Sequence, residues 1–341
     1  MSIEAFLRQG FIPFRDAVGR EVEVLRSAVP RLMADAADAA RVLEGPGHIT
    51  FAGIGASFAA LAAPVSYLSS RGIPSSRINA GEATPLPATD AVVALSQSGR
   101  SRETVAMLRE ARGPKLAIVN VSDSPMAKIA DAVLSLGDLP DSLASTIGYT
   151  ASVMAVSMLA EARAEGAPAQ SWLSIAGRLE AFVAANDTAV EAFADMLADS
   201  TSADFVAPSE FSGIAEGGSL LIREVARKPV APFETRQYLH GLMESTSDTT
   251  MHIVVDGPDE GEIVRALLPL KRRIVEFRAS PRASEDGNTI VVAVEPASPL
   301  ELPLFVAVFL QHAVLRSAVA NGIDPDEFLF LDTGTKLGDG E

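Results

Sequence analysis

The 341-residue sequence predicts an α/β protein with two doubly wound parallel-sheet domains in tandem, preceded by an N-terminal helical arm. Three observations lead to this fold class. The length suits two domains of ordinary size. Short runs rich in Ile, Val, Phe and Ala, without polar alternation, lie between helical segments, as in parallel sheets covered by helices on both faces. The same order of elements starts again near Asp204, which indicates a structural repeat.

The first half predicts the arm and one sheet domain. Residues 1–45 form the arm, because apolar residues at helical spacing make one stripe that includes Val18, Val22, Leu25, Val29 and Leu32. The first domain spans residues 46–165, with strands expected at 48–53, 77–80, 90–96, 115–121 and 132–136. Helices are expected at 57–70 and 103–112, and an Ala-rich helix at 145–165 closes the domain.

The second half predicts a similar order of elements. A helical connector spans residues 166–200, with one helix from about 170 to 200. The second domain spans residues 201–321, with strands at 204–207, 251–256, 273–277 and 289–294 and helices at 213–227 and 302–320. Its most apolar stretch, 303–314, is shorter than the ~18 residues of a membrane span, so we expect a buried helix. A Gly- and Asp-rich tail occupies residues 322–341.

Composition argues against several classes of function. The 28 Lys and Arg residues against 44 Asp and Glu residues give a net charge of −16, so no nucleic-acid partner is expected. The absence of cysteine excludes disulfides, thiolate nucleophiles and cysteine metal sites. The first 20 residues lack the apolar core of a signal peptide. We therefore expect a cytoplasmic protein with no membrane partner.

A first turn at a strand end has the composition of an anion site. The strand at 48–53 runs into Gly55-Ala56-Ser57, where small residues and a hydroxyl precede a helix whose free N–H groups favour a phosphate. The dinucleotide fingerprint needs a third small residue where Phe58 stands, and no acidic residue follows at the expected distance. No nicotinamide or other cofactor is therefore predicted.

A second turn, after the strand at 90–96, is rich in hydroxyl groups. Its hydroxyls belong to Ser96, Ser98, Ser101 and Thr104, and they surround one glycine before the next helix. Hydroxyls and backbone amides can hold a phosphate monoester reversibly. The alternative is an ordinary helix cap, for which serine is common. Because both turns follow strands expected to be neighbours, at the edge where α/β sheets bind ligands, we favour a phosphate site.

These turns resemble those of a known family. Gly55-Ala56-Ser57, Ser96-Gln97-Ser98-Gly99 and Leu143-Ala144-Ser145-Thr146 resemble the sugar isomerase (SIS) domain family. From about residue 46 the chain is similar to the isomerase half of glucosamine-6-phosphate synthases, and to phosphosugar isomerases and hexosamine-phosphate deaminases that lack a glutaminase half. The resemblance implies two flavodoxin-like SIS domains and a homodimer in which the neighbouring subunit contributes the site histidine. It also implies that Ser57, Ser96, Gln97, Ser98 and Ser101 hold a sugar phosphate, and that Ala144 and Ser145 contact the sugar.

The resemblance extends to two candidate catalytic residues. Glu224 and His240, sixteen positions apart, match the family's Lys-Glu and Lys-His-Gly pair. A carboxylate can move a carbon-bound proton between C1 and C2 of a sugar, and histidine suits ring opening near neutral pH. We predict an isomerase or deaminase acting on a hexose or hexosamine 6-phosphate. A surface glutamate and a packed histidine are the alternatives for the two residues.

Two departures from the family pattern keep another function open. Leu221 stands where the family has a lysine one helical turn before the glutamate. The family's C-terminal Schiff-base lysine aligns with Thr333, while Lys336, three residues later, either reaches the site or is solvated. Direct amination of fructose 6-phosphate is not expected, and a non-catalytic sugar-phosphate sensor is the alternative function. His240 and Glu244 have metal-ligand spacing without a third ligand, so no metal is predicted.

Overall fold

The computed structural model describes residues 11–45, 47–82, 89–257, 259–279, 287–330 and 334–337. The chain divides into two compact units, residues 1–177 with 328–341, and residues 178–327. Each unit contains one five-stranded parallel sheet, in agreement with the predicted α/β class. The expected arm belongs to the first unit, and so does the expected tail from residue 328 onward. The limits of the predicted domains stay a prediction.

The sheet of the first unit has the order β2-β1-β3-β4-β5. Its strands are β1 (Ile49–Gly53), β2 (Ser75–Asn79), β3 (Ala91–Leu95), β4 (Lys115–Val119) and β5 (Ala132–Ser135). Every residue of β1 and β3 is buried, which explains why these runs are apolar without alternation. All five strands were predicted, with ends that differ by no more than two residues. β1 and β3 pair directly, so the two turns that follow them lie at the same sheet edge.

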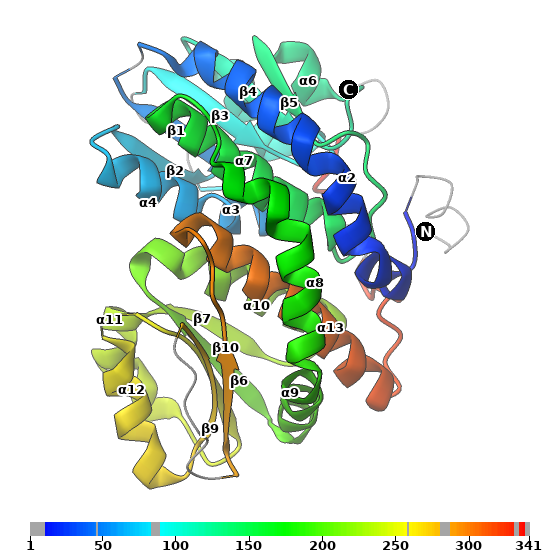
Figure 1. Cartoon of the computed structure of the whole chain (residues 1–341), viewed down its shortest axis with the longest axis vertical. Helices are drawn as coiled ribbons and strands as arrows, with labels where there is room; N and C mark the ends of the chain where they lie inside the picture. The colour runs from blue at the N-terminus through cyan, green and yellow to red at the C-terminus, as the bar shows by residue number, and fades with distance from the viewer. Residues whose placement is uncertain are drawn as a thin grey trace. The chain divides into compact units, whose positions relative to one another are not determined.

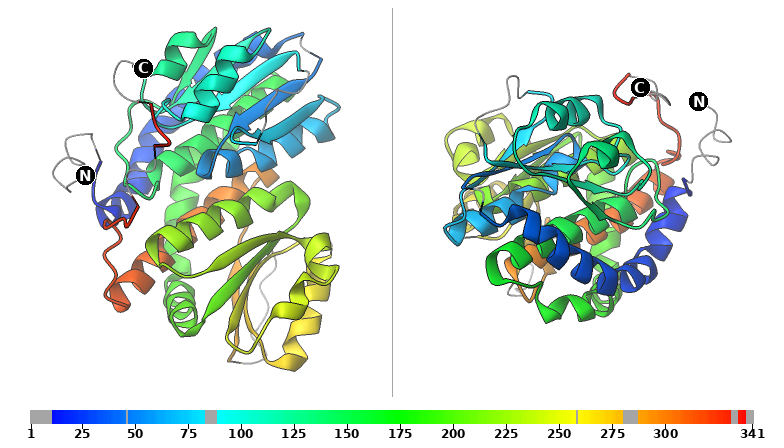
Figure 2. Two further views of the ribbon diagram at one scale, coloured as in Figure 1. Left: turned by 180° about the vertical axis from the view of Figure 1, so that it is seen from behind. Right: turned by 90° about the horizontal axis from the view of Figure 1, so that it is seen from above.

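Helices cover both faces of this sheet (Figures 1 and 2). The helices are α2 (Phe14–Ala40), α3 (Ala56–Ala59), α4 (Ala62–Ser70), α5 (Arg102–Glu110), α6 (Pro125–Ile129) and α7 (Ile147–Glu165). α2, α4 and α7 pack together on one face, and α5 and α6 pack on the other. The first ten residues of the predicted arm lie outside the described residues. The prediction of a single helix at 57–70 is wrong, because the structure has two helices, α3 and α4, in this region. Pro64 lacks an N–H donor, and its ring disfavours a continuous helix through Ala60.

The sheet of the second unit has the order β10-β9-β8-β6-β7. Its strands are β6 (Ser202–Ala207), β7 (Val230–Glu234), β8 (Thr250–Val255), β9 (Arg273–Arg278) and β10 (Thr289–Ala293). Numbered within each unit, both sheets have the order 2-1-3-4-5, which supports the predicted structural repeat. β7 was not predicted. Its Pro232 cannot donate a ladder hydrogen bond and is tolerated because β7 is an edge strand.

Helices also cover both faces of the second sheet (Figure 1). They are α9 (Asp187–Asp199), α10 (Ser212–Val225), α11 (Thr235–Leu239), α12 (Glu260–Leu267) and α13 (Leu302–Ala320). α9, α10 and α13 pack on one face, and α11 and α12 contact the strands from the other. α8 (Ile175–Ala185) crosses the limit between the two units. The single helix expected at 170–200 is wrong, because the chain leaves helical geometry at Asn186.

The predicted buried helix at the end of the second domain is α13. Its rings Phe305 and Phe309 pack edge-to-face on Phe182, Phe193 and Phe277, with centroids 5.1–5.7 Å apart. Among the described residues, Pro299–Ala320 is the one helix long and apolar enough to cross a membrane, with a mean hydropathy of 1.6. Two thirds (67%) of its 18-residue apolar window is buried inside the protein, and core helices pass the same test.

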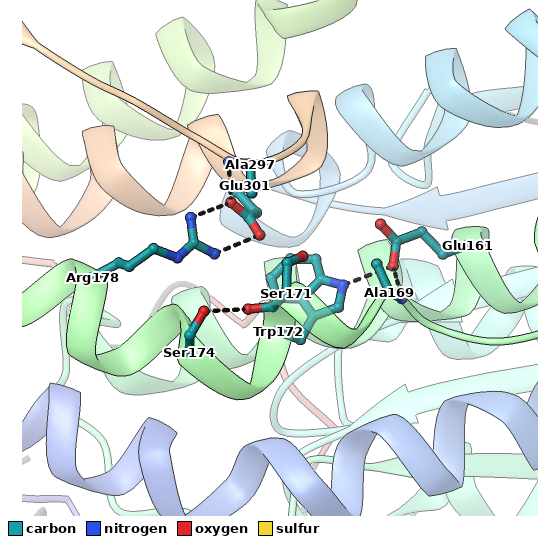
Figure 3. Close-up of polar contacts among 8 residues, drawn as sticks. All are labelled: Glu161, Ala169, Ser171, Trp172, Ser174, Arg178, Ala297 and Glu301. Atoms are coloured by element: carbon teal, nitrogen blue, oxygen red, sulfur yellow. Dashed lines mark hydrogen bonds and ion pairs between the residues drawn. The ribbon is translucent and has the colours of Figure 1, made fainter.

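A buried carboxylate accepts hydrogen bonds in each unit (Figure 3). In the first unit, Glu161 accepts hydrogen bonds from Trp172 Nε1 at 2.7 Å and from the backbone N–H of Ala169 at 2.8 Å. In the second unit, Glu301 accepts two hydrogen bonds of 2.7 Å from the Arg178 guanidinium. Each carboxylate is buried but paired, as a buried charge must be.

Candidate functional site

The first turn brings small residues to the carboxyl end of β1. A Cβ at Gly53 would lie 2.8 Å from the backbone of Ser57, so glycine allows α3 to approach the strand. Gly55 adopts a positive φ of 58°, which favours glycine. Ser57 is half-buried, and Ala56 begins α3. Because α3 is a single turn, its dipole supports an anion site only weakly.

The serine loop, residues 96–101, follows β3 at the same edge of the sheet. The carbonyl of Gln97 accepts hydrogen bonds from the backbone N–H groups of Asn120 (2.8 Å) and Val121 (3.0 Å), which fix the loop to the end of β4. Gly99 has a φ of 59°, and a Cβ there would collide with Ser124. The loop therefore has a fixed shape that depends on glycine at one position.

The hydroxyl groups of this region differ in accessibility. Ser96 and Ser101 are buried, and their Oγ atoms lie 3.1 Å apart within hydrogen-bond distance. Thr104 is fully buried, and its hydroxyl has no hydrogen-bond partner among the described residues. Ser98 is half-buried. Of the four predicted hydroxyls, Ser98 is the one most available to a ligand, while Ser96 and Ser101 stabilise each other.

The C-terminal segment 334–337 lies against the serine loop within the first unit. Backbone hydrogen bonds join Leu337 N to Arg100 O (2.9 Å) and Arg102 N to Thr335 O (3.2 Å). Lys336 Nζ donates to Ser98 Oγ at 3.0 Å. Desolvation lowers the pKa of Lys336, and the Glu103 carboxylate opposes that shift. The structure thus brings Lys336 to the predicted phosphate site, whereas Thr333 lies outside the described residues.

The turn at 141–145 lies beside Gln97 and contains a residue that the sequence analysis missed. Ser145 Oγ lies 2.9 Å from Gln97 Oε1 and 2.6 Å from Asp141 Oδ2. Asp141 is 7% exposed, and its Oδ1 also accepts a 2.9 Å hydrogen bond from the backbone N–H of Thr146. Burial raises the pKa of Asp141, and these hydrogen bonds oppose the shift. An acidic residue just before a predicted helix was the signal available in the sequence. Ala144, at 1% exposed, offers no side-chain surface to a sugar.

Glu224 occupies the last turn of α10 in the second unit. Its side chain is half-buried, and burial raises its pKa to about 7. No hydrogen bond or ion pair of its carboxylate is found among the described residues. A carboxyl group that titrates near neutral pH can both accept and return a proton, which is the property that a general acid–base catalyst needs.

His240 ends α11 and is exposed. The helix is held to the sheet by Tyr238, whose hydroxyl lies 2.7 Å from Asp204 Oδ2 and 3.0 Å from His252 Nδ1. Burial lowers the pKa of His252 to about 4, so this histidine is neutral at pH 7. His252 is therefore a packed residue, while His240 remains open to solvent.

The predicted site residues thus fall in two groups. Those of the phosphate and sugar site lie together with Lys336 at one sheet edge of the first unit, and Glu224 and His240 belong to the second unit. Within the part of the chain that the structure describes, no group of three or more His, Cys, Asp or Glu side chains could hold a metal ion.

Comparison with known proteins finds a family match for a segment of the first unit. Residues 43–162 match the SIS domain family model. Glutamine–fructose-6-phosphate aminotransferase [isomerizing] from Caulobacter vibrioides is 26% identical over 257 residues, which cover 69% of this chain and 42% of that protein. The chain therefore spans less than half the length of this curated relative.

Solved structures share the fold over nearly the whole chain. The C-terminal domain of glucosamine-fructose-6-phosphate aminotransferase from Francisella tularensis matches with a TM-score of 0.76 and 18% identity, covering 91% of this chain and 96% of that chain. Tagatose-6-phosphate ketose/aldose isomerase from Escherichia coli matches with a TM-score of 0.74 and 16% identity, covering 94% of this chain and 96% of that chain. Glucosamine-6-phosphate deaminase from Thermotoga maritima matches with a TM-score of 0.68 and 16% identity, covering 91% of this chain and 98% of that chain.

Proposed function

We propose that this chain is a phosphosugar isomerase or deaminase of the SIS domain family, whose model residues 43–162 match. The substrate we propose is a hexose or hexosamine 6-phosphate, converted by proton transfer between C1 and C2. The observation that carries the proposal is the serine loop, where an accessible hydroxyl and a lysine ammonium meet at the carboxyl edge of the first sheet. The similar proteins named above act on phosphorylated hexoses, which supports the same substrate class here.

In this proposal the serine loop and the first turn hold the phosphate. Ser98 Oγ and Lys336 Nζ supply a neutral donor and a cation, and Gly55 and Ser57 follow β1 at the same edge of the sheet. Ser96, Ser101 and Thr104 keep the loop in shape rather than contact the ligand. Binding energy from the phosphate, remote from the reacting carbons, orients the sugar. Lys336 lies at the phosphate end, so we assign it no covalent role.

Glu224 is proposed to transfer the proton. Its carboxylate removes the proton at C2 of an open-chain aldose phosphate while the C1 carbonyl oxygen takes a proton from water, which gives an enediol. The carboxylic acid then returns its proton to C1 while the C2 hydroxyl gives its proton to water, which gives the ketose. When C2 carries an amine, the same transfer gives an imine at C2, which water hydrolyses to the ketone with release of ammonia. His240 is proposed to open the sugar ring by moving a proton between the ring oxygen and the C1 hydroxyl. A pKa of about 7 lets Glu224 act in both directions near neutral pH.

Two further features belong to the same proposal. We propose a homodimer, because the family resemblance implies that the neighbouring subunit contributes the site histidine, and His240 is exposed. We also propose a second SIS domain, because the second unit repeats the strand order of the first. The cytoplasmic location expected from the absence of cysteine remains a proposal.

The test measures the exchange of the C1 and C2 protons with solvent deuterium. Fructose, glucose, glucosamine, galactosamine and N-acetylglucosamine 6-phosphates are incubated with the protein in D2O, and deuterium at C1 or C2 is read by NMR beside an ammonia assay. One substrate should take up deuterium. Glu224→Gln should lower that rate at least ~100-fold while keeping the affinity for the compound. Glu216→Gln, the same change on the same helix, serves as the matched control and should keep the rate.

Three results would contradict the proposal in different ways. Absence of deuterium and ammonia with every compound would reject the isomerase and deaminase reactions. Binding of a 6-phosphate without exchange would favour the sugar-phosphate sensor. Full exchange by Glu224→Gln would show that another group is the base.

A further inference from the structure

The hydroxyl of Ser145 lies between two groups that both act as acceptors. It is 2.6 Å from Asp141 Oδ2 and 2.9 Å from Gln97 Oε1. A serine hydroxyl has one proton, so it cannot donate to both oxygens. Either Asp141 carries a proton and donates to Ser145, or the amide of Gln97 presents its nitrogen to Ser145. The two branches of an amide have the same shape, so both arrangements fit the same space.

The surroundings of Asp141 favour the charged carboxylate. Its oxygens accept from the backbone N–H groups of Ser142, Thr146 and Gly148 and from the hydroxyl of Thr146. Such a set of donors stabilises an anion, and it opposes the effect of burial on the carboxyl. The 2.6 Å contact with Ser145 is also shorter than the one to Gln97, as expected for a hydroxyl that donates to a carboxylate. The hydroxyl proton of Ser145 therefore belongs to Asp141.

We propose that Asp141 is a positioning residue that acts through Ser145 to orient the amide of Gln97. Ser145 donates to Asp141 and accepts from Gln97 Nε2, which leaves Gln97 Oε1 as the branch available to a ligand. The half-buried side chain of Gln97 makes no other hydrogen bond among the described residues. Gly148 makes this arrangement possible, because a Cβ there would collide with Asp141 and lie 3.0 Å from Gln97.

This orientation changes what Gln97 recognises. A carbonyl oxygen repels a phosphate, whose oxygens are acceptors, and it attracts a donor such as a sugar hydroxyl. Gln97 is thus a specificity-determining residue for a hydroxyl of the sugar, while the phosphate is left to Ser98, Lys336 and the backbone. The inference rests on the proposed function and deepens it, because it separates the sugar contact from the phosphate contact.

The orientation is measured directly in the ligand-free protein. The side-chain NH2 signals of Gln97 are assigned in 15N–1H spectra by their loss in Gln97→Met. One of the two protons should be shifted downfield and exchange slowly in the wild type. In Asp141→Asn the side-chain NH2 group donates to Ser145, so the Ser145 hydroxyl donates to Gln97 Oε1 instead. The Gln97 amide then has the opposite orientation, and its downfield-shifted NH2 proton should disappear from the spectrum. An unchanged Gln97 signal in Asp141→Asn would overturn the proposal.

Binding supplies the second readout. Affinities for glucose 6-phosphate and inorganic phosphate are measured by calorimetry for the wild type, Asp141→Asn and Ser145→Ala. Both variants should bind glucose 6-phosphate about tenfold more weakly and inorganic phosphate within about twofold of the wild type, as expected for loss of one sugar hydrogen bond. Ser145→Ala leaves the hydrogen bonds from the backbone to Asp141 intact, so it tests the proposal even where Asp141→Asn fails to fold. Ser142→Ala, a buried hydroxyl of the same turn that donates to Ala144 O, is the matched control.

The outcomes separate the two proposals. An equal loss of affinity for both ligands in Ser145→Ala would mean a purely structural role and would reject the relay. Failure of the wild type to bind glucose 6-phosphate would count against the proposed function, and the Gln97 spectrum would still decide the orientation of the amide.

Discussion

Replacement of Glu224 by glutamine is expected to stabilise the folded protein in alkaline solution. Burial raises the pKa of this carboxyl to about 7, against 4.5 for an accessible glutamate. Between these values the unfolded chain has lost the proton and the folded chain has kept it. Stability therefore falls as pH rises through this window, because the folded state binds more protons there than the unfolded state. Glutamine carries no charge in either state and avoids the loss.

The magnitude follows from the two pKa values. A carboxyl that titrates near 7 when folded and near 4.5 when unfolded destabilises the protein above pH 7 by about 3 kcal/mol. Glu224→Gln should therefore raise the free energy of unfolding by roughly that amount at pH 8 and leave it unchanged at pH 4. Burial lowers the pKa of His252 to about 4, so the wild type also loses stability as pH falls toward that value. This opposite trend masks the effect of Glu224 when the stability of the wild type alone is plotted against pH.

The assay is urea unfolding of the wild type and of Glu224→Gln at several values between pH 4 and pH 8. The difference between the two proteins cancels the contribution of His252. A difference that grows with pH and levels off above pH 7 agrees with a Glu224 carboxyl whose pKa is raised to about 7 in the folded state. A difference independent of pH would refute the reasoning, since it would place the carboxyl in water in both states. Glu216→Gln on the same helix controls for the loss of a negative charge.

The remaining predictions concern the serine loop. Gly99→Ala should destabilise the protein by about 3 kcal/mol in urea unfolding, because strain at positive φ adds to the collision with Ser124. Gly72→Ala, at a φ of 74° with nothing within 4 Å, should lose only about 1 kcal/mol, and equal losses would contradict the collision. Lys336→Met should weaken binding of glucose 6-phosphate about tenfold in calorimetry at low salt, through loss of the cation beside Ser98, and a loss insensitive to salt would contradict this.

The fold could be predicted from the sequence wherever local pattern and burial agree. Fully buried strands such as β3 are continuous apolar runs, and α13 is mostly apolar because it packs within a cluster of aromatic rings. The predictions failed where a tertiary position overrides local pattern. β7 is a strand despite Pro232 because it lies at the sheet edge. α12 was missed because eight residues are too few for the helical period of its apolar residues to stand out.

The candidate site was predictable in its polar residues but not in its hydrogen bonds. Serines at the carboxyl ends of neighbouring strands indicated the loop, and the structure places them at one edge. No local signal could show that Ser96 and Ser101 bond to each other, or that Lys336 returns to Ser98 across 238 positions of sequence. Those contacts depend on where a distant segment of chain lies in three dimensions.

The two sheets have the same strand order, but the loops after their third strands differ in charge. In the first unit β3 leads into serine hydroxyls beside a lysine, whereas in the second unit β8 leads into Asp256, Asp259 and Glu260. Glu260 is 2% exposed and accepts hydrogen bonds from the Thr235 hydroxyl and the Asp259 backbone, so this loop already holds a buried carboxylate. A phosphate would meet repulsion there. In the proposed function the anion site therefore belongs to the first unit, and α10 and α11 of the second unit carry the proposed catalytic residues Glu224 and His240.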